Sequence, residues 1–109
     1  MNTDIKVISP QGILDGTQAK EFRVEVDQSL GEGAKIILVN FHDVTFMDSS
    51  GLGALVLALK AIRSKGSKIM LCSINEQVKM LFELTSMDKV FQIFADEEEF
   101  KNSVYNLTE

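Results

Sequence analysis

The sequence predicts a single α/β domain with a largely parallel sheet. Short apolar runs that are typical of strands alternate with segments whose apolar residues recur every three or four positions, as in helices. Strands that alternate with helices are joined by right-handed crossovers, so they lie parallel in one sheet. The 109 residues suffice for one domain with its own core, and we expect residues 1–109 to form it.

The first half of the chain contains two strand–helix units. The expected elements, in order, are a strand at residues 5–9, a short return strand at Ile13 and Leu14, a helix over residues 15–30, a strand at residues 35–40, a loop at residues 41–47 and a helix to about Lys65. Alternating apolar and polar residues predict the first strand. Asp15 followed by Gln18 resembles a capping box and begins the first helix. Four consecutive apolar residues, Ile36–Val39, indicate a strand that is covered on both faces.

The second half continues the alternation. The expected elements are a strand at residues 68–72, a helix from Asn75 to about Ser86, a strand at residues 90–94 and a final helix after Asp96. Gly66 ends the preceding helix, because glycine adopts the left-handed conformation at little cost. Asn75 is a candidate N-cap, and Asp96 with Glu99 forms a second candidate capping box.

Composition and charge narrow the classes of partner. The net charge of −5 and the pI of about 4.8 disfavour nucleic acid and anionic membranes, which repel an acidic surface. Cys72 is the single cysteine, so no internal disulfide forms, which suits a reducing compartment. Residues 1–6 lack the pattern of a signal peptide, and no apolar run reaches the roughly 20 residues of a membrane span. We therefore expect a cytoplasmic protein that binds neither nucleic acid nor membrane.

The stretch Phe46–Gly53 (FMDSSGLG) concentrates polar and flexible groups at a strand-to-helix junction. At about 100° per residue, Ser50 points away from the apolar side of the following helix, and Ser49 lies on its flank. The residues on that apolar side are Leu52, Leu55, Val56, Leu59 and Ile62. The residues near the line of Ser50 are Ala54, Leu57, Ala61 and Ser64. This second face is either a smooth docking surface around an accessible serine or a face covered by another helix.

Catalytic and ligand-binding interpretations of this stretch fit poorly. A nucleotide site lacks the glycine–lysine pattern of a phosphate loop, and Asp48 would repel phosphates. A hydrolase elbow needs glycine where Asp48 stands, and His42 is the only histidine that could serve as base. A receiver-type phosphoacceptor at Asp48 needs an acidic pair after the first strand, where Ser9 and Pro10 stand. We expect no enzyme activity, no metal and no cofactor, and an inert buried thiol at Cys72.

A fourth interpretation makes Ser50 the substrate of a protein kinase. A phosphoserine carries about −1.5 to −2 charges, and at a helix N-terminus this charge is favoured by roughly 0.3–1 kcal/mol. Modification is therefore expected to leave the helix folded. A unit charge pair at about 4 Å is worth up to about 4 kcal/mol at an effective dielectric of about 20, and even half of this exceeds a tenfold change in affinity. Phosphorylation is therefore expected to act on the binding of a partner.

Three segments resemble the STAS-domain anti-sigma factor antagonists of bacteria, and the resemblance covers nearly the whole chain. They are Gly12–Asp15 (GILD), Val44–Gly53 (VTFMDSSGLG) and Leu81–Phe91 (LFELTSMDKVF). The resemblance implies a single STAS domain with a mixed central sheet of about four or five strands and helices packed mainly on one side. It also implies a partner switch. The unphosphorylated chain binds an anti-sigma factor that is also a serine kinase, and a sigma factor is thereby released. ATP-dependent phosphorylation of Ser50 ends the binding, and a PP2C-type phosphatase reverses it.

The resemblance and the helical-face argument together assign contact residues. Asp15 matches the family's acid near the phosphorylated serine, which makes it a docking residue. The predicted partner-binding residues are Asp15, Asp48, Ser49, Ser50, Gly51, Gly53, Ala54 and Leu57, with phosphorylation at Ser50. The alternative is a non-switching STAS scaffold that is associated with a transporter or a stress complex.

Overall fold

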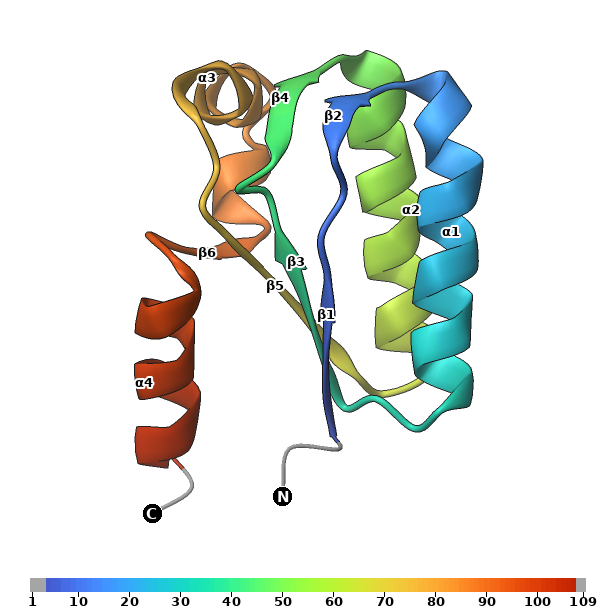
Figure 1. Cartoon of the computed structure of the whole chain (residues 1–109), viewed down its shortest axis with the longest axis vertical. Helices are drawn as coiled ribbons and strands as arrows, with labels where there is room; N and C mark the ends of the chain where they lie inside the picture. The colour runs from blue at the N-terminus through green and yellow to red at the C-terminus, as the bar shows by residue number, and fades with distance from the viewer. Residues whose placement is uncertain (1–3, 108–109) are drawn as a thin grey trace.

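Within residues 4–107, which the computed structural model describes, the chain forms two sheets and four α-helices (Figure 1). Side chains are described for residues 4–104. The elements are β1 (Ile5–Ile8), β2 (Gly12–Leu14), α1 (Gly16–Gly31), β3 (Ile36–Asn40), β4 (Val44–Met47), α2 (Ser49–Ser64), β5 (Lys68–Cys72), α3 (Glu76–Thr85), a 3₁₀ turn (Met87–Lys89), β6 (Gln92–Phe94) and α4 (Glu97–Leu107). The predicted domain of residues 1–109 extends past both ends of this range, so residues 1–3 and 108–109 lie outside the described residues.

The main sheet has the strand order β1-β3-β5-β6, and each neighbouring pair is parallel. The α/β class is therefore confirmed. The parallel pairing agrees with the alternation of strands and helices and differs from the mixed sheet that the resemblance implied. A helix between successive strands returns the chain to the same end of the sheet, which makes parallel pairing possible.

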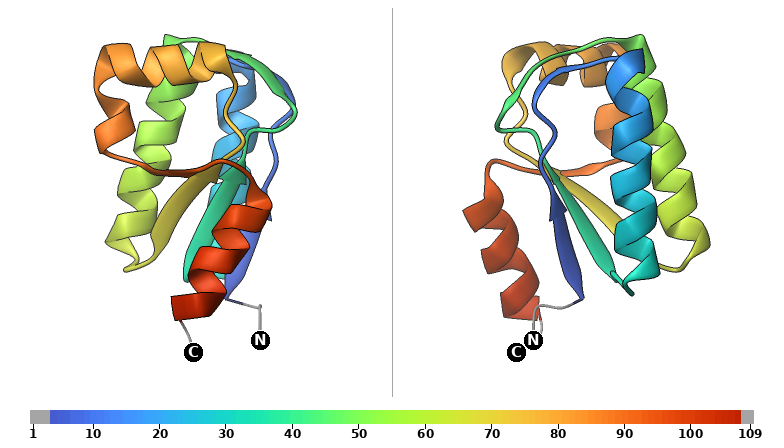
Figure 2. Two further views of the ribbon diagram at one scale, coloured as in Figure 1. Left: turned by 90° about the vertical axis from the view of Figure 1, so that its left-hand side faces the viewer. Right: turned by 45° about the vertical axis from the view of Figure 1, so that its right-hand side comes forward.

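Helices cover both faces of this sheet. α1 and α2 stand side by side on one face, α4 stands on the other, and α3 lies across one end (Figures 1 and 2). Ile37 and Val39 of β3 belong to the main core, whereas Leu38 belongs to a second, smaller core with Phe100 and Val104 of α4. The prediction that Ile36–Val39 is covered on both faces is thus confirmed. No helix within residues 4–107 is both long and apolar enough to cross a bilayer.

A separate two-stranded sheet pairs β2 with β4 in parallel. The prediction of a loop through residues 41–47 is wrong for Val44–Met47, and the predicted return strand pairs with β4 instead of folding back on β1. Burial explains the pairing, because Leu14 and Met47 point into the main core. Ile13 lies opposite Phe46 in the same register, and both stay exposed.

The predicted helix ends in the second half of the chain are confirmed. Asn75 accepts the N–H of Val78 at 2.9 Å, which caps α3. Asp96 accepts the N–H of Glu99 at 2.8 Å at the start of α4. Gly66 has a φ of 75° just past α2, where other residues would be strained. These local signals fix where the crossover helices begin and end.

Candidate functional site

Two strand–aspartate–helix junctions lie next to each other in the fold (Figure 1). β2 ends at Leu14 and Asp15 caps α1, while β4 ends at Met47 and Asp48 caps α2. Leu14 pairs in register with Met47. The first turns of the two helices therefore start at the same level, side by side.

Asp48 begins α2. One carboxylate oxygen of Asp48 accepts the N–H of Gly51 at 2.9 Å, and the backbone of Asp48 is extended, as expected at an N-cap. The side chain is partly buried. Asp48 thus has a structural role within the chain, in addition to the contact with a partner that the sequence predicts.

Asp15 begins α1 in the same way. Its Oδ1 accepts the hydroxyl of Thr17 at 2.6 Å and the N–H groups of Thr17 and Gln18 at 3.0 and 3.3 Å. The hydroxyl of Thr17 is the largest cause that holds the pKa of Asp15 below its ordinary value of 3.8, and the two N–H groups add to it. The predicted helix start is confirmed, and it places a carboxylate beside the first turn of α2.

Ser49 and Ser50 occupy the first turn of α2, and both are exposed. Exposure therefore does not distinguish the two serines. What distinguishes Ser50 is the neighbouring helix, because a Cβ built on Gly16 of α1 would lie 3.8 Å from Ser50 Cβ and 4.0 Å from Ser50 Oγ. Ser50 thus faces solvent at the point where α1 and α2 begin together.

The two glycines of the motif have different environments. Gly51 is buried, and a Cβ there would collide with the carbonyl oxygen of Leu14 and lie 2.9 Å from its carbonyl carbon. Gly51 is therefore corrected from a partner contact to a packing position, because a buried residue without a side chain offers a partner almost no surface. Gly53 is exposed with open space where a Cβ would lie. Its contact with a partner stays a prediction.

The face of α2 that carries Ser50 is open on one flank and covered on the other. Ala54 is half-buried and packs against the main core, and Ala58, one turn further, is fully buried. Leu57 exposes 54% of its surface. Both alternatives for this face therefore apply in part, with α1 beside the covered flank and a free surface along Ser50, Gly53 and Leu57.

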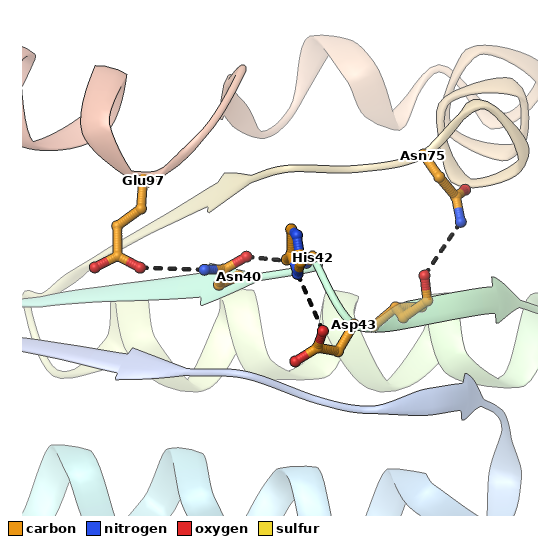
Figure 3. Close-up of polar contacts among 6 residues, drawn as sticks. Asn40, His42, Asp43, Asn75 and Glu97 are labelled. Atoms are coloured by element: carbon orange, nitrogen blue, oxygen red, sulfur yellow. Dashed lines mark hydrogen bonds and ion pairs between the residues drawn. The ribbon is translucent and has the colours of Figure 1, made fainter.

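Side chains of α3 and its cap hold the strand that leads into the motif. Gln77 Oε1 accepts the N–H of Met47 at 2.8 Å, and Gln77 Nε2 donates to the carbonyl of Met47 at 2.8 Å. Asn75 Nδ2 donates to the carbonyls of Val44 and Thr45 at 3.2 and 3.3 Å, as Figure 3 shows for Asn75 reaching β4. Sequence reasoning missed Gln77, because a glutamine near the start of a helix gives no signal of bonding to a strand far away in the chain.

His42 belongs to a different polar chain. Its Nδ1 lies 3.0 Å from Asp43 Oδ1, and its backbone N–H donates to Asn40 Oδ1 at 2.9 Å (Figure 3). Asn40 Nδ2 donates to Glu97 Oε1 of α4 at 3.1 Å. Among the residues with described side chains, no hydrogen bond joins His42 to either serine, so the pairing that a hydrolase elbow requires is not formed there.

Comparisons with known proteins agree with this geometry. The chain matches the family model of the STAS domain over residues 1–100. The anti-sigma F factor antagonist of Paenibacillus polymyxa is 27% identical over 94 residues, which are 85% of this chain and 80% of the relative. A Thermotoga maritima protein named as a candidate anti-sigma factor antagonist is 34% identical over 92 residues, which are 84% of this chain and 81% of the relative. Proteins of this kind are regulatory binding proteins rather than enzymes.

Solved structures share the whole arrangement. The crystal structure of the Thermotoga maritima protein superposes with a TM-score of 0.85 at 31% identity and covers 94% of this chain and 88% of its own. Unphosphorylated SpoIIAA has the same fold, with a TM-score of 0.76 at 20% identity over 93% of this chain and 89% of its own. Sequence, strand order and helix placement thus agree over most of both chains, and the protein belongs to the STAS domain family.

Proposed function

We propose that this protein is an anti-sigma factor antagonist whose partner binding is controlled by phosphorylation of Ser50. The unphosphorylated chain binds an anti-sigma factor that is also an ATP-dependent serine kinase, and a sigma factor is thereby released. A PP2C-type phosphatase removes the phosphate, and the cycle runs in the bacterial cytoplasm. The observation that carries the proposal is the exposed hydroxyl of Ser50, which lies at the joint start of two helices in a STAS fold.

The surroundings of Ser50 suit a kinase substrate and a docking surface. A partner reaching Ser50 also meets the first turn of α1 at Gly16 and the exposed side chain of Leu57 on α2. The residues proposed to contact the partner are Asp15, Asp48, Ser49, Ser50, Gly53, Ala54 and Leu57. Gly51 lies behind them and supports the close contact between α2 and β2.

A phosphate on Ser50 acts on this surface more than on the fold. The modified side chain stays in solvent at a helix N-terminus, where a negative charge is favoured by roughly 0.3–1 kcal/mol. In a complex the same charge faces the partner in a less polar environment, where one charge pair outweighs the local helix effect. Solved structures of SpoIIAA in the unphosphorylated and the phosphorylated form support a phosphorylation-controlled role for a protein of this fold.

The test combines phosphosite mapping with binding. The purified chain is incubated with ATP and serine kinases from its own cell, and the modified residue is identified by mass spectrometry. Label is expected on Ser50, retained in the matched control Ser49→Ala and lost in Ser50→Ala. The labelling kinase is then titrated with Ser50→Ala and Ser50→Asp, and Ser50→Asp is expected to bind at least about tenfold more weakly.

Two results would contradict the proposal. One is label on Ser49 alone, which would move the modification to the other serine. The other is equal kinase affinity of Ser50→Ala and Ser50→Asp, which would favour the non-switching scaffold. Turnover of a substrate that disappears in both Ser50→Ala and His42→Ala would assign the protein to the enzymes instead.

A further inference from the structure

Two lysines flank Leu57 on the outer surface where α1 and α2 run side by side (Figure 1). Gly16 of α1 lies next to Ser50 of α2, and Lys20 follows Gly16 by one turn on the same side of α1. Leu57 lies two turns beyond Ser50 on the same side of α2, and Lys60 follows Leu57 by one turn. Along this surface the order is therefore Ser50, Lys20, Leu57 and Lys60.

These side chains are available to a partner. Lys20, Leu57 and Lys60 are all exposed. The lysine and arginine ion pairs among the described side chains use Lys6, Arg23 and Lys101, so they leave Lys20 and Lys60 uncompensated. The chain as a whole carries a net charge of −5, so two uncompensated lysines around an exposed leucine are a local departure from an acidic surface.

We propose that Leu57, Lys20 and Lys60 form a contact surface for the partner kinase, and that the kinase presents an apolar pocket with carboxylates at its rim. The assignment of this partner rests on the proposed function. Charge complementarity carries the chemistry, because an apolar anchor between two lysines fits an apolar pocket between carboxylates. A second copy of this chain fits worse, since paired copies related by symmetry would bring the lysines of both surfaces together.

Lys20 also connects this surface to Ser50. Side chains on a helix lean toward its N-terminus, and the long stem of Lys20 therefore extends toward the first turns of α1 and α2. A phosphate on Ser50 lies within the reach of this ammonium group. Phosphorylation then does two things: it adds negative charge that faces the carboxylates of the kinase, and it pairs with the lysine that otherwise attracts them.

The first experiment measures binding of the unphosphorylated chain to the purified kinase that labels it. Lys20→Gln and Lys60→Gln are expected to weaken the complex about two- to fivefold each, mainly through slower association. The effect is expected to shrink between about 0.05 M and about 0.5 M salt. Lys79→Gln on α3 removes the same charge from an exposed position away from this surface and serves as the matched control. Equal affinity of all three variants at low salt would overturn the proposal.

The second experiment needs no partner. Phosphoserine is installed at position 50 during translation, and the phosphate is titrated by ³¹P NMR in the wild type, Lys20→Gln and Lys79→Gln. Loss of a nearby ammonium is expected to raise the second pKa of the phosphate by about 0.3 pH unit in Lys20→Gln, which corresponds to about a twofold change. Lys79→Gln is expected to titrate like the wild type. Identical titrations of all three would overturn the link between Lys20 and Ser50.

The two experiments separate failure of this inference from failure of the proposed function. If no kinase labels Ser50, the proposed function fails and the kinase surface fails with it, whereas the phosphate titration still decides the pairing of Lys20. If a kinase labels Ser50 but binds the lysine variants like the wild type, only the lysine surface is overturned. Self-association in sedimentation that disappears in Leu57→Ala would assign the surface to a second copy and overturn the kinase assignment.

Discussion

At the scale of single residues, Gly51 sets how closely α2 approaches β2. A Cβ at this position would meet backbone atoms of Leu14, which have no rotamer to change. Gly51→Ala is therefore expected to destabilise the protein by about 1–3 kcal/mol, the usual cost of overpacking. Gly53→Ala is the matched control, since nothing lies near its added methyl group and alanine favours a helix by about 0.5–1 kcal/mol. Urea unfolding of both variants checks this, and equal stability of the two would contradict it.

Asp15 gives the start of α1 a defined pH dependence. Because the pKa of Asp15 is lowered from 3.8 in the folded chain, chiefly by the Thr17 hydroxyl, the folded state holds fewer protons than the unfolded state in acid. Its charged carboxylate therefore stabilises the fold above about pH 4, and this contribution is lost as the pH falls through the lowered pKa. The free energy of unfolding is expected to fall more steeply below about pH 4 in the wild type than in Asp15→Asn. Denaturant unfolding from neutral to acidic pH tests this, and parallel profiles throughout would show that Asp15 contributes nothing.

The same residues show what the sequence reveals about the site. Asp15 begins its helix through hydrogen bonds to residues two and three positions on, so local pattern predicts it correctly. Gly51 depends on a backbone carbonyl that lies far away in the chain, and its sequence environment gives no sign of that contact. Local periodicity also separates Ser50 from the core face, but only the tertiary structure places Gly16 beside it.

At the scale of elements, β4 depends on α3 as much as on β2. Gln77 bonds both backbone groups of Met47, the last residue of β4. Gln77→Ala would leave a partly buried N–H and carbonyl without a partner, which costs about 1–3 kcal/mol. Lys79→Ala, an exposed change on the same helix, is expected to leave stability unchanged within about 0.5 kcal/mol. Thermal unfolding of the two variants tests the difference, and a neutral Gln77→Ala would show that β4 stands without this support.

Elements differ in how far the sequence predicts them. The helices and the strands of the main sheet follow from periodicity and caps, which are local properties. β4 is only four residues long and buries Val44 and Met47 while Thr45 and Phe46 stay exposed, so its pattern is not a strict alternation. Its pairing with β2 spans a whole strand–helix unit. A short strand whose partner is distant gives little signal, which explains why a loop is predicted there.

At the scale of the whole molecule, α4 is the cover of the second face of the sheet. Phe100 is buried and meets Phe94 edge to face, with ring centroids 5.6 Å apart. Beneath it lies the buried thiol of Cys72, whose pKa is raised by burial. Phe100→Ala removes about 3–5 kcal/mol of core packing and is expected to release α4 while the main core persists.

Cys72 reports this opening directly, because it is the single cysteine of the chain. Labelling with a thiol reagent is expected to be at least about tenfold faster in Phe100→Ala than in the wild type. Asn102→Ala, an exposed change on α4, should label like the wild type. If the labelling of Phe100→Ala keeps pace with global loss of circular dichroism, α4 does not open separately from the rest.

The adjacent starts of α1 and α2 also determine what a modifying enzyme must read. Ser50 belongs to one segment of the chain, but the surface around it includes Gly16 from a segment more than thirty positions earlier. The recognition epitope is therefore discontinuous and exists only in the folded protein. A short synthetic peptide that spans Phe46–Gly53 carries the serine without its neighbouring helix, so it lacks half of the epitope. A kinase or phosphatase that acts here reads a tertiary structure rather than a consensus sequence.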